Sequence, residues 1–381
     1  MMEAAVNTTV HGNGSVPPPE GLSFTLAQSI PLAFVLFLVI VGAALGNIIV
    51  VGTLAQTWPN TIGKPGNLLV FWLAVADGLL ALLVMPFSLV TTIGDSWILG
   101  DVFCQIEGFL FTFLTTSSNM ALGMISLNRY YKVSQPSASE NIARARAKKL
   151  LLYGWIHAAA VAVTVVSGWG NVSSGEDLVC LPTWDTSARS LTNLVFVSIA
   201  AYILPSCIMG ITYYRIFHIV RRRSKKVIPH ASSLKESDRN NPRGSLATNN
   251  GGAQGNGAVA GPSRPTNGTA HFTVQSNGAN GVSVLPRAAQ THMHSSYQKQ
   301  ATENKTVVTL LIILGMFMVL WTPFIIVTFV RSFAPELVGP STRAITVLMV
   351  FVNSAANPVV YSLRNTSFRA AARDFVCACG C

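Results

Sequence analysis

Apolar residues gather in seven long runs that are separated by short polar stretches. Each run is long enough for a helix that crosses a bilayer, which takes roughly 20 residues. Seven such runs in 381 residues leave too little polar sequence to cover them as the core of a soluble protein. The pattern therefore predicts an all-α integral membrane protein with a seven-transmembrane-helix bundle. The runs lie at about 30–55, 67–92, 103–130, 150–169, 191–220, 305–331 and 343–363.

The polar stretches divide the chain further. Residues 1–29 form a polar N-terminal tail, and 30–363 contain the bundle. Within the bundle, 224–300 is rich in Asn, Gly, Ser and Ala, a composition typical of disorder, so we expect a disordered third inner loop. In 364–381 apolar residues recur on one helical face before a cysteine-rich end. This predicts a short amphipathic helix on the inner membrane surface.

The distribution of charge sets the orientation. Only 11% of the residues are charged, against about 25% in a soluble domain. With the N-terminus outside, Arg189, Arg331 and Arg343 are the only outer basic residues of the 26 in the chain. The positive-inside rule thus predicts an extracellular N-terminus in the plasma membrane. The net charge of +11 then faces the cytosol, where it suits anionic membrane lipids and acidic partners rather than nucleic acid.

Three kinds of modification follow from this topology. Sequons predict N-glycosylation at outer asparagines, although such triplets also occur by chance. Cys104 and Cys180 are the only outer cysteines, and the outer compartment permits a disulfide between them. The last cysteines predict reversible palmitoylation, with a chance cluster as the alternative. The sequons begin at Asn7, Asn13 and Asn171, and the last cysteines are Cys377, Cys379 and Cys381.

Polar residues inside the apolar runs suggest a buried polar core around Asp77, the one deeply placed ionisable group. Oxygen ligands there suit a small hard cation such as sodium. A hydrogen-bonded contact between helices without an ion fits the residues equally well. We expect no required cofactor, only this allosteric ion. The other polar residues of the core are Asn47, Ser118, Asn119, Asn353 and Asn357.

Motifs occur in a fixed order, about one per run. They include G-N (46–47), L-A-V-A-D (73–77), N-R-Y (128–130), W-T-P-F (321–324) and N-P-V-V-Y (357–361). Together they show that the chain resembles a rhodopsin-like (class A) G-protein-coupled receptor of orphan type. The resemblance implies a receptor, not an enzyme, that signals to heterotrimeric G proteins, with arrestin and receptor kinases as further partners. It also favours the sodium reading, because the family's pocket matches Asp77, Ser118, Asn353 and Asn357.

The resemblance also implies a ligand pocket. Phe111 stands where amine receptors carry an aspartate, and Phe351 where opsins carry their retinal-binding lysine. We therefore expect an apolar or lipid-like ligand, whose acid group would meet Arg331 and Arg343 at the rim. These arginines could instead meet lipid headgroups or Glu336. The other implied lining residues are Thr112, Thr115, Val197, Ser198, Phe324, Ile325, Thr328 and Val347.

The family's activation switch can be carried over in the same way. The acid that usually precedes the arginine of N-R-Y is replaced here by Asn128, so we expect Glu303 to restrain Arg129 and basal activity to be raised. Asn119 stands where the family often has Ile, which we expect to loosen the relay. Pro205 is expected to interrupt its helix, as are two prolines of the switch. The implied switch residues are Asn128, Arg129, Tyr130, Tyr213, Glu303, Phe317, Trp321, Pro323, Pro358 and Tyr361.

Two other functions remain open on these residues. A ligand-independent constitutive or scaffolding receptor-like protein would show nucleotide exchange on a purified G protein without ligand, for which Asn128 is a hint. A channel or transporter would show flux in proteoliposomes, although we find no inverted repeat of the kind that transporters use.

Overall fold

The computed structural model describes residues 24–56, 64–170, 172–173, 177–237, 287–364 and 366–380. For some of these residues only the backbone is described, namely 224–237, 287–307, 309–310, 361, 363–364, 366–367 and 379–380. The chain forms two compact units, residues 1–219 with 304–381 and residues 220–303. The sites discussed below all lie in the first unit.

Seven stretches of helix in the described residues are long and apolar enough to cross a membrane, which confirms the predicted seven-span bundle. Large apolar side chains such as Phe37, Leu152 and Val319 are exposed on its outside, whereas Asp77 and Asn119 are completely buried. This distribution is expected of a protein whose outer surface meets lipid. The helices are α1 (Leu26–Gln56), α2 (Pro65–Leu83), α3 (Met85–Gly94), α4 (Asp101–Ser134), α5 (Glu140–Val166), α6 (Ala188–Ser198), α7 (Leu204–Ser237), α8 (Arg287–Phe333), α9 (Pro340–Arg364) and α10 (Thr366–Gly380).

The irregular turns lie partly elsewhere than expected. The second span breaks at Val84 between α2 and α3, because Pro86 cannot continue the regular hydrogen bonding. The fifth span contains a π-helical turn, η1 (Ile199–Ile203), just before Pro205. In contrast, α8 continues through Pro323 and α9 through Pro358. The expected interruption of these two helices is therefore wrong, since neighbouring helices can satisfy the freed backbone groups.

The disulfide end of the bundle, called the outer end on the predicted topology, is covered by the loop between α5 and α6. Two short antiparallel strands, β1 (Val172–Ser173) and β2 (Leu181–Pro182), form a hairpin there. The predicted disulfide between Cys104 and Cys180 joins this loop to α4. A short 3-10 helix, η2 (Pro335–Leu337), connects α8 and α9 at the same end.

The backbone of α4 approaches this hairpin at Gly108. A Cβ added there would lie 2.8 Å from Cγ1 of Val172 and 3.0 Å from the carbonyl oxygen of Cys180. We expect Gly108→Ala to lower the stability of the purified protein by about 1–3 kcal/mol, as overpacking does in other cores. The control is Gly42→Ala in α1, where a Cβ would meet nothing within 4 Å. Equal thermal unfolding midpoints for the two variants would contradict this close contact.

The inner end differs from the prediction in one respect. Helix α7 continues to Ser237 and α8 begins at Arg287, so both ends of the expected disordered loop 224–300 are helical. The Lys, Gln and Ala residues at these ends favour helix, but the composition of the whole segment concealed this. Residues 238–286 lie outside the described residues.

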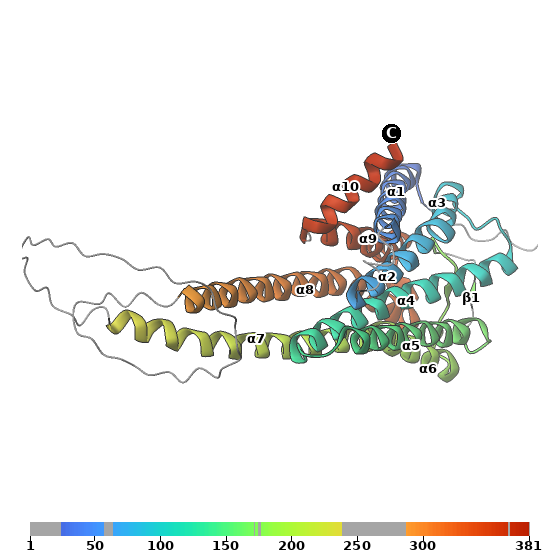
Figure 1. Cartoon of the computed structure of the whole chain (residues 1–381). Helices are drawn as coiled ribbons and strands as arrows, with labels where there is room; N and C mark the ends of the chain where they lie inside the picture. Colours follow the sequence, from blue (N-terminus) through green and yellow to red (C-terminus); the bar gives the residue numbers. More distant parts are fainter. Residues whose placement is uncertain are drawn as a thin grey trace, which may run out of the picture. The chain divides into compact units, whose positions relative to one another are not determined.

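The predicted amphipathic helix is present as α10. It lies beside α1 and α9 (Figure 1). Phe375 packs directly onto Gly52, where a Cβ would lie 2.2 Å from its ring. Cys377 is exposed near the end of α10, and the other two terminal cysteines lie outside the described side chains. Helix α10 is therefore fixed to the bundle by a specific contact, and its palmitoylation stays a prediction.

Candidate functional site

A small apolar cavity of about 50 Å³ lies in the outer half of the bundle, between α4, the fifth span and α8. Eight of the twelve predicted ligand residues line it. Thr116 and Trp321 line it as well, and both carry a buried polar atom without a hydrogen-bond partner, the Oγ1 and the Nε1 respectively. The eight are Phe111, Thr112, Thr115, Val197, Ser198, Phe324, Ile325 and Thr328.

Aromatic rings connect this cavity to the core of the bundle. Phe111 contacts Phe324 with ring centroids 6.4 Å apart, and Phe324 contacts Trp321 at 6.0 Å. Trp321 in turn lies 6.1 Å from Phe317, which stacks on Tyr202 of η1. The predicted relay residues Trp321 and Phe317 thus lie on one continuous path. A displacement of a ring in the cavity can reach the π-helical turn through packed side chains.

Phe351 was expected to line the pocket, but it lines neither outer cavity. It is completely buried in α9, and its ring lies 6.2 Å from that of Phe111. Phe111 lines the apolar cavity, so Phe351 contacts a wall residue rather than the cavity itself. Phe351 therefore supports the wall of the cavity from behind.

A larger cavity of about 430 Å³ opens at the outer end, above the apolar one. Phe324, Thr328, Leu181, Pro182 and Trp184 line both cavities, so the two are adjacent. The remaining predicted ligand residues Arg331, Arg343 and Val347 line the outer cavity.

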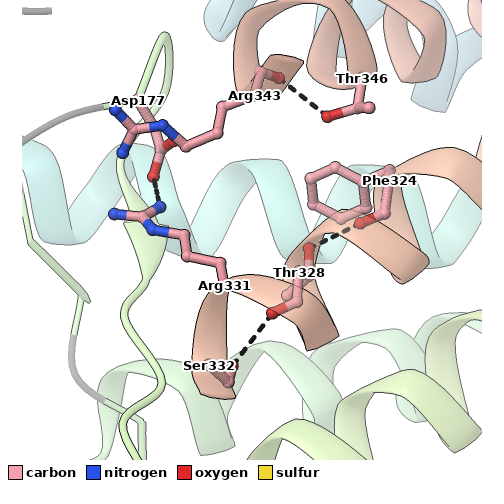
Figure 2. A network of polar contacts seen from close by, with 7 residues as sticks. All are labelled: Asp177, Phe324, Thr328, Arg331, Ser332, Arg343 and Thr346. Atoms are coloured by element: carbon pink, nitrogen blue, oxygen red, sulfur yellow. Dashed lines mark hydrogen bonds and ion pairs between the residues drawn. The ribbon is translucent and has the colours of Figure 1, made fainter. Parts of the chain in front are cut away.

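The two arginines share one partner in the outer loop. The carboxylate of Asp177 forms an ion pair with Arg331 of α8, and its Oδ1 lies 3.7 Å from Nε of Arg343 in α9 (Figure 2). The side chains of Asp177 and Arg343 are nearly buried, at 7% and 8% exposed. The expected partners were a ligand, lipid headgroups or Glu336; the sequence reading missed Asp177. Nothing in the local sequence around Asp177 indicates this pairing, because it joins three separate segments.

A second acid, Asp185, also lines the outer cavity. Hydrogen bonds donated by the hydroxyl and the backbone of Ser187 hold the pKa of Asp185 below its usual range. Asp185 therefore stays ionised at neutral pH. The cavity lining then carries two positive and two negative side chains, so an acidic ligand group must compete with a carboxylate that is already present.

The polar core around Asp77 forms largely as predicted. Its Oδ1 accepts a hydrogen bond from Ser354 at 2.8 Å, and its Oδ2 accepts one from the amide of Asn357 at 2.7 Å. The hydroxyl of Ser118 is buried close to the same carboxylate but lies outside hydrogen-bonding geometry. Ser354, rather than its neighbour Asn353, makes this contact. Helical spacing could have identified it, because Ser354 and Asn357 are three residues apart on one face.

Asn47 and Asn119 each hold a backbone segment of a neighbouring helix. The amide of Asn47 donates to the carbonyl oxygen of Ser354 at 3.1 Å. The amide of Asn119 donates to the carbonyl oxygen of Ala201 in η1 at 3.0 Å. A π-helical turn exposes carbonyl groups of this kind. Asn119 therefore ties α4 to the fifth span, and the expected loosening of the relay stays a prediction.

Four of the predicted switch residues lie near the inner end of α4 and α7, namely Asn128, Arg129, Tyr130 and Tyr213. Tyr213 is buried and lies within electrostatic range of Arg129. The guanidinium of Arg215 lies 5.8 Å from the ring of Tyr130. Pro358 packs closely against Gly46, where a Cβ would lie 3.0 Å from the proline ring. The residues Asn7, Asn13, Asn171 and Cys381 and the side chains of Glu303, Tyr361 and Cys379 lie outside the described part, so their predicted roles stay predictions.

Comparison with known proteins agrees with this arrangement. The family described as 7 transmembrane receptor (rhodopsin family) matches residues 46–361. The chain is 28% identical to the 5-hydroxytryptamine receptor 4 of Homo sapiens, over 96% of this chain and 84% of the receptor. It is 27% identical to the G protein-coupled receptor 161 of Bos taurus, over 92% of this chain but only 60% of that protein. The fold resembles squid rhodopsin, with a TM-score of 0.69, 19% identity and coverage of 91% of this chain and 85% of rhodopsin. The chain therefore belongs to the rhodopsin family of seven-transmembrane receptors and is a G-protein-coupled receptor rather than an enzyme.

Proposed function

We propose that this receptor, in the plasma membrane with its N-terminus outside, responds to an extracellular apolar or lipid-like ligand that carries an acid group. The observation that supports this is the pair of adjacent outer cavities. The apolar cavity is lined by apolar and hydroxyl side chains, and two buried polar atoms in its lining have no hydrogen-bond partner. The outer one offers Arg331 and Arg343. The acid group would take a share of the two guanidinium groups from Asp177. The apolar body would occupy the outer cavity of about 430 Å³ and extend toward the smaller apolar cavity.

The lining of the apolar cavity disfavours an amine ligand. The related 5-hydroxytryptamine receptor 4 is named for an amine. Among the described residues no acidic side chain lines the apolar cavity, and Phe111 stands where amine receptors carry an aspartate. A cation placed there would lose its hydration without gaining a counter-ion, which costs several kcal/mol.

A ligand screen tests this proposal. Purified receptor in nanodiscs would be heated with a matched series of probes that share one hydrocarbon chain and differ in the head group: oleic acid, oleyl alcohol and oleylamine. We expect the acid to raise the unfolding temperature most, and Arg343→Gln to remove its advantage over the alcohol. Stabilisation by the amine alone would refute an acid-bearing ligand.

We also propose that the restraint on Arg129 is weaker than in most of the family, so that the receptor signals to its heterotrimeric G protein without ligand. Asn128 supports this proposal, because an amide can accept a hydrogen bond but cannot neutralise a guanidinium group. Basal activity measured on a purified G protein would decide this, as developed in the Discussion.

The third element of the proposal is an allosteric sodium ion at Asp77. The donor set fits a hard cation, since the carboxylate and the hydroxyl groups of Ser118 and Ser354 supply oxygen ligands in one buried place. The ion would connect α2, α4 and α9 through these residues and would stabilise the conformation in which they converge.

Replacement of the carboxylate tests the sodium site. In the unmodified receptor we expect the unfolding temperature to be higher in sodium chloride than in choline chloride at equal ionic strength. Asp77→Asn should abolish that difference while keeping the side-chain shape. Ser117→Ala is the matched control, because Ser117 lines a different pocket with Trp72 and Trp155. A sodium effect that survives in Asp77→Asn would place the ion elsewhere.

A further inference from the structure

A third cavity, of about 350 Å³, lies at the inner end of the bundle, away from the two outer cavities. It is enclosed by the start of α2, the end of α4, the loop 135–139 and the first turns of α5. We call it the inner basic cavity, because it is lined by Lys64, Arg129, Lys132 and Arg146. Its volume falls within the usual range of small-molecule sites, about 300–1,000 Å³.

The charge of this cavity is strongly one-sided. Among the described residues, the lining contains four basic side chains and one acid, Glu140, whose Oε1 lies 3.6 Å from Nη2 of Arg144 outside the lining. The positive charges of Lys64 and Arg129 act on Lys132, so these groups are close enough to repel one another. Like charges held together in a cavity raise the local concentration of anions.

One of the four cations is oriented by neutral partners. Nη2 of Arg146 donates a hydrogen bond to Oε1 of Gln135 at 3.0 Å. Its guanidinium also lies 4.1 Å from the centre of the Tyr131 ring. These contacts fix the planar group without offsetting its charge by a carboxylate. Arg146 is therefore positioned in advance for an anion.

Asn128 keeps the wall of the cavity free of a further carboxylate. Its amide lines the cavity and approaches the start of α2, where a Cβ on Gly66 would lie 3.7 Å from Nδ2. An acid at this position would face the same four cations and would repel an incoming anion. The neutral amide does not reduce the positive potential of the four basic side chains, and it can itself donate a hydrogen bond to a phosphate oxygen.

The predicted topology places this cavity at the level of the cytosolic leaflet, which is rich in anionic lipids. We propose that the inner basic cavity binds a phosphate monoester group, carried by the headgroup of an inner-leaflet phosphoinositide. A phosphate monoester brings up to two negative charges and three acceptor oxygens, which matches converging Lys and Arg donors better than a single carboxylate does. This site does not depend on the identity of the outer ligand, although Asn128 and Arg129 also belong to the proposed switch.

The test is a binding measurement on the full-length receptor in phosphatidylcholine nanodiscs. The probe is fluorescent phosphatidylinositol bisphosphate, with phosphatidylserine at equal total charge as the comparison. We expect Lys132→Gln and Arg146→Gln each to weaken binding about fivefold, since one basic residue near an anionic headgroup contributes about 1 kcal/mol. The control is the double variant Lys148→Gln and Lys149→Gln, which removes two exposed charges of α5 that do not line the cavity.

Two further variants separate binding from folding. Asn128→Asp should weaken binding without the loss of any basic residue, and Lys132→Arg should preserve it. Each variant must elute as a monodisperse receptor with an unfolding temperature no lower than that of the unmodified receptor before its binding is compared. If Asn128→Asp binds the probe as tightly as the unmodified receptor, a neutral side chain at position 128 is not needed for anion binding.

The remaining outcomes are equally decisive. Equal losses in the α5 control and the cavity variants, or no preference over phosphatidylserine, would show diffuse surface attraction and refute the site. Competition by soluble inositol trisphosphate at the same affinity would support the phosphate chemistry but refute the lipid as its source. Competition only by the lipid would support the proposal in full.

Discussion

Asp177→Ala is expected to lower the stability of the receptor by about 2 kcal/mol and to make it more responsive to acid-bearing ligands. Removing one partner of a buried ion pair costs about 3–5 kcal/mol, and the partial exposure of Arg331, at 24%, reduces this figure. The change leaves two guanidinium groups near each other without the carboxylate that lay between them. A ligand carboxylate can then take this place without competition, so an added fatty acid should restore part of the lost stability.

Thermal unfolding with and without oleic acid measures both effects. The control is Glu336→Ala, which removes an exposed acid of η2 at the same end of the bundle. Arg343→Gln should be destabilising by itself and should reduce the effect of a second Asp177→Ala change, since the two residues interact. Additive losses in the double variant would show that the contact between Asp177 and Arg343 contributes nothing.

Asn128→Asp is expected to lower ligand-independent G-protein activation by about tenfold. A carboxylate beside the half-buried Arg129 would stabilise the closed state by roughly 1.4 kcal/mol, which corresponds to a tenfold change in the population of the open state. Nucleotide exchange on a purified G protein, measured without ligand, gives the effect directly. Asn141→Asp is the control, because Asn141 is exposed at the start of α5 and does not line the inner basic cavity.

The complementary change is Glu303→Ala. If Glu303 supplies the remaining restraint on Arg129, its removal should raise basal exchange further, because its carboxylate would no longer stabilise the closed state. Unchanged basal exchange in Glu303→Ala, or an Asn128→Asp variant that is as active as the unmodified receptor, would refute the proposed switch. Asn128→Asp is also expected to lose phosphoinositide binding. Measuring basal exchange in detergent without lipid separates the direct effect on the switch from the effect of lost phosphoinositide.

Much of the fold and part of the polar core could be predicted from the sequence. The seven spans follow from the cost of an unsatisfied backbone in lipid, which forces long apolar helices that any hydropathy pattern reveals. The disulfide between Cys104 and Cys180 follows from topology, since the chain offers no other outer cysteine. The contact of Asp77 with Asn357 follows from the rule that polar groups buried in a bundle pair with one another.

Other features depended on packing between segments far apart in the chain. The sequence alone determined the bundle, its orientation signal and the family motifs, because these depend on composition and local spacing. Only the tertiary structure decided that Asp177 holds Arg331 and Arg343, that Asn119 secures a π-helical turn, and that Phe351 lies behind Phe111. Such contacts depend on the rotation and depth of each helix, which are fixed by side-chain packing between helices and leave no periodic trace in the sequence.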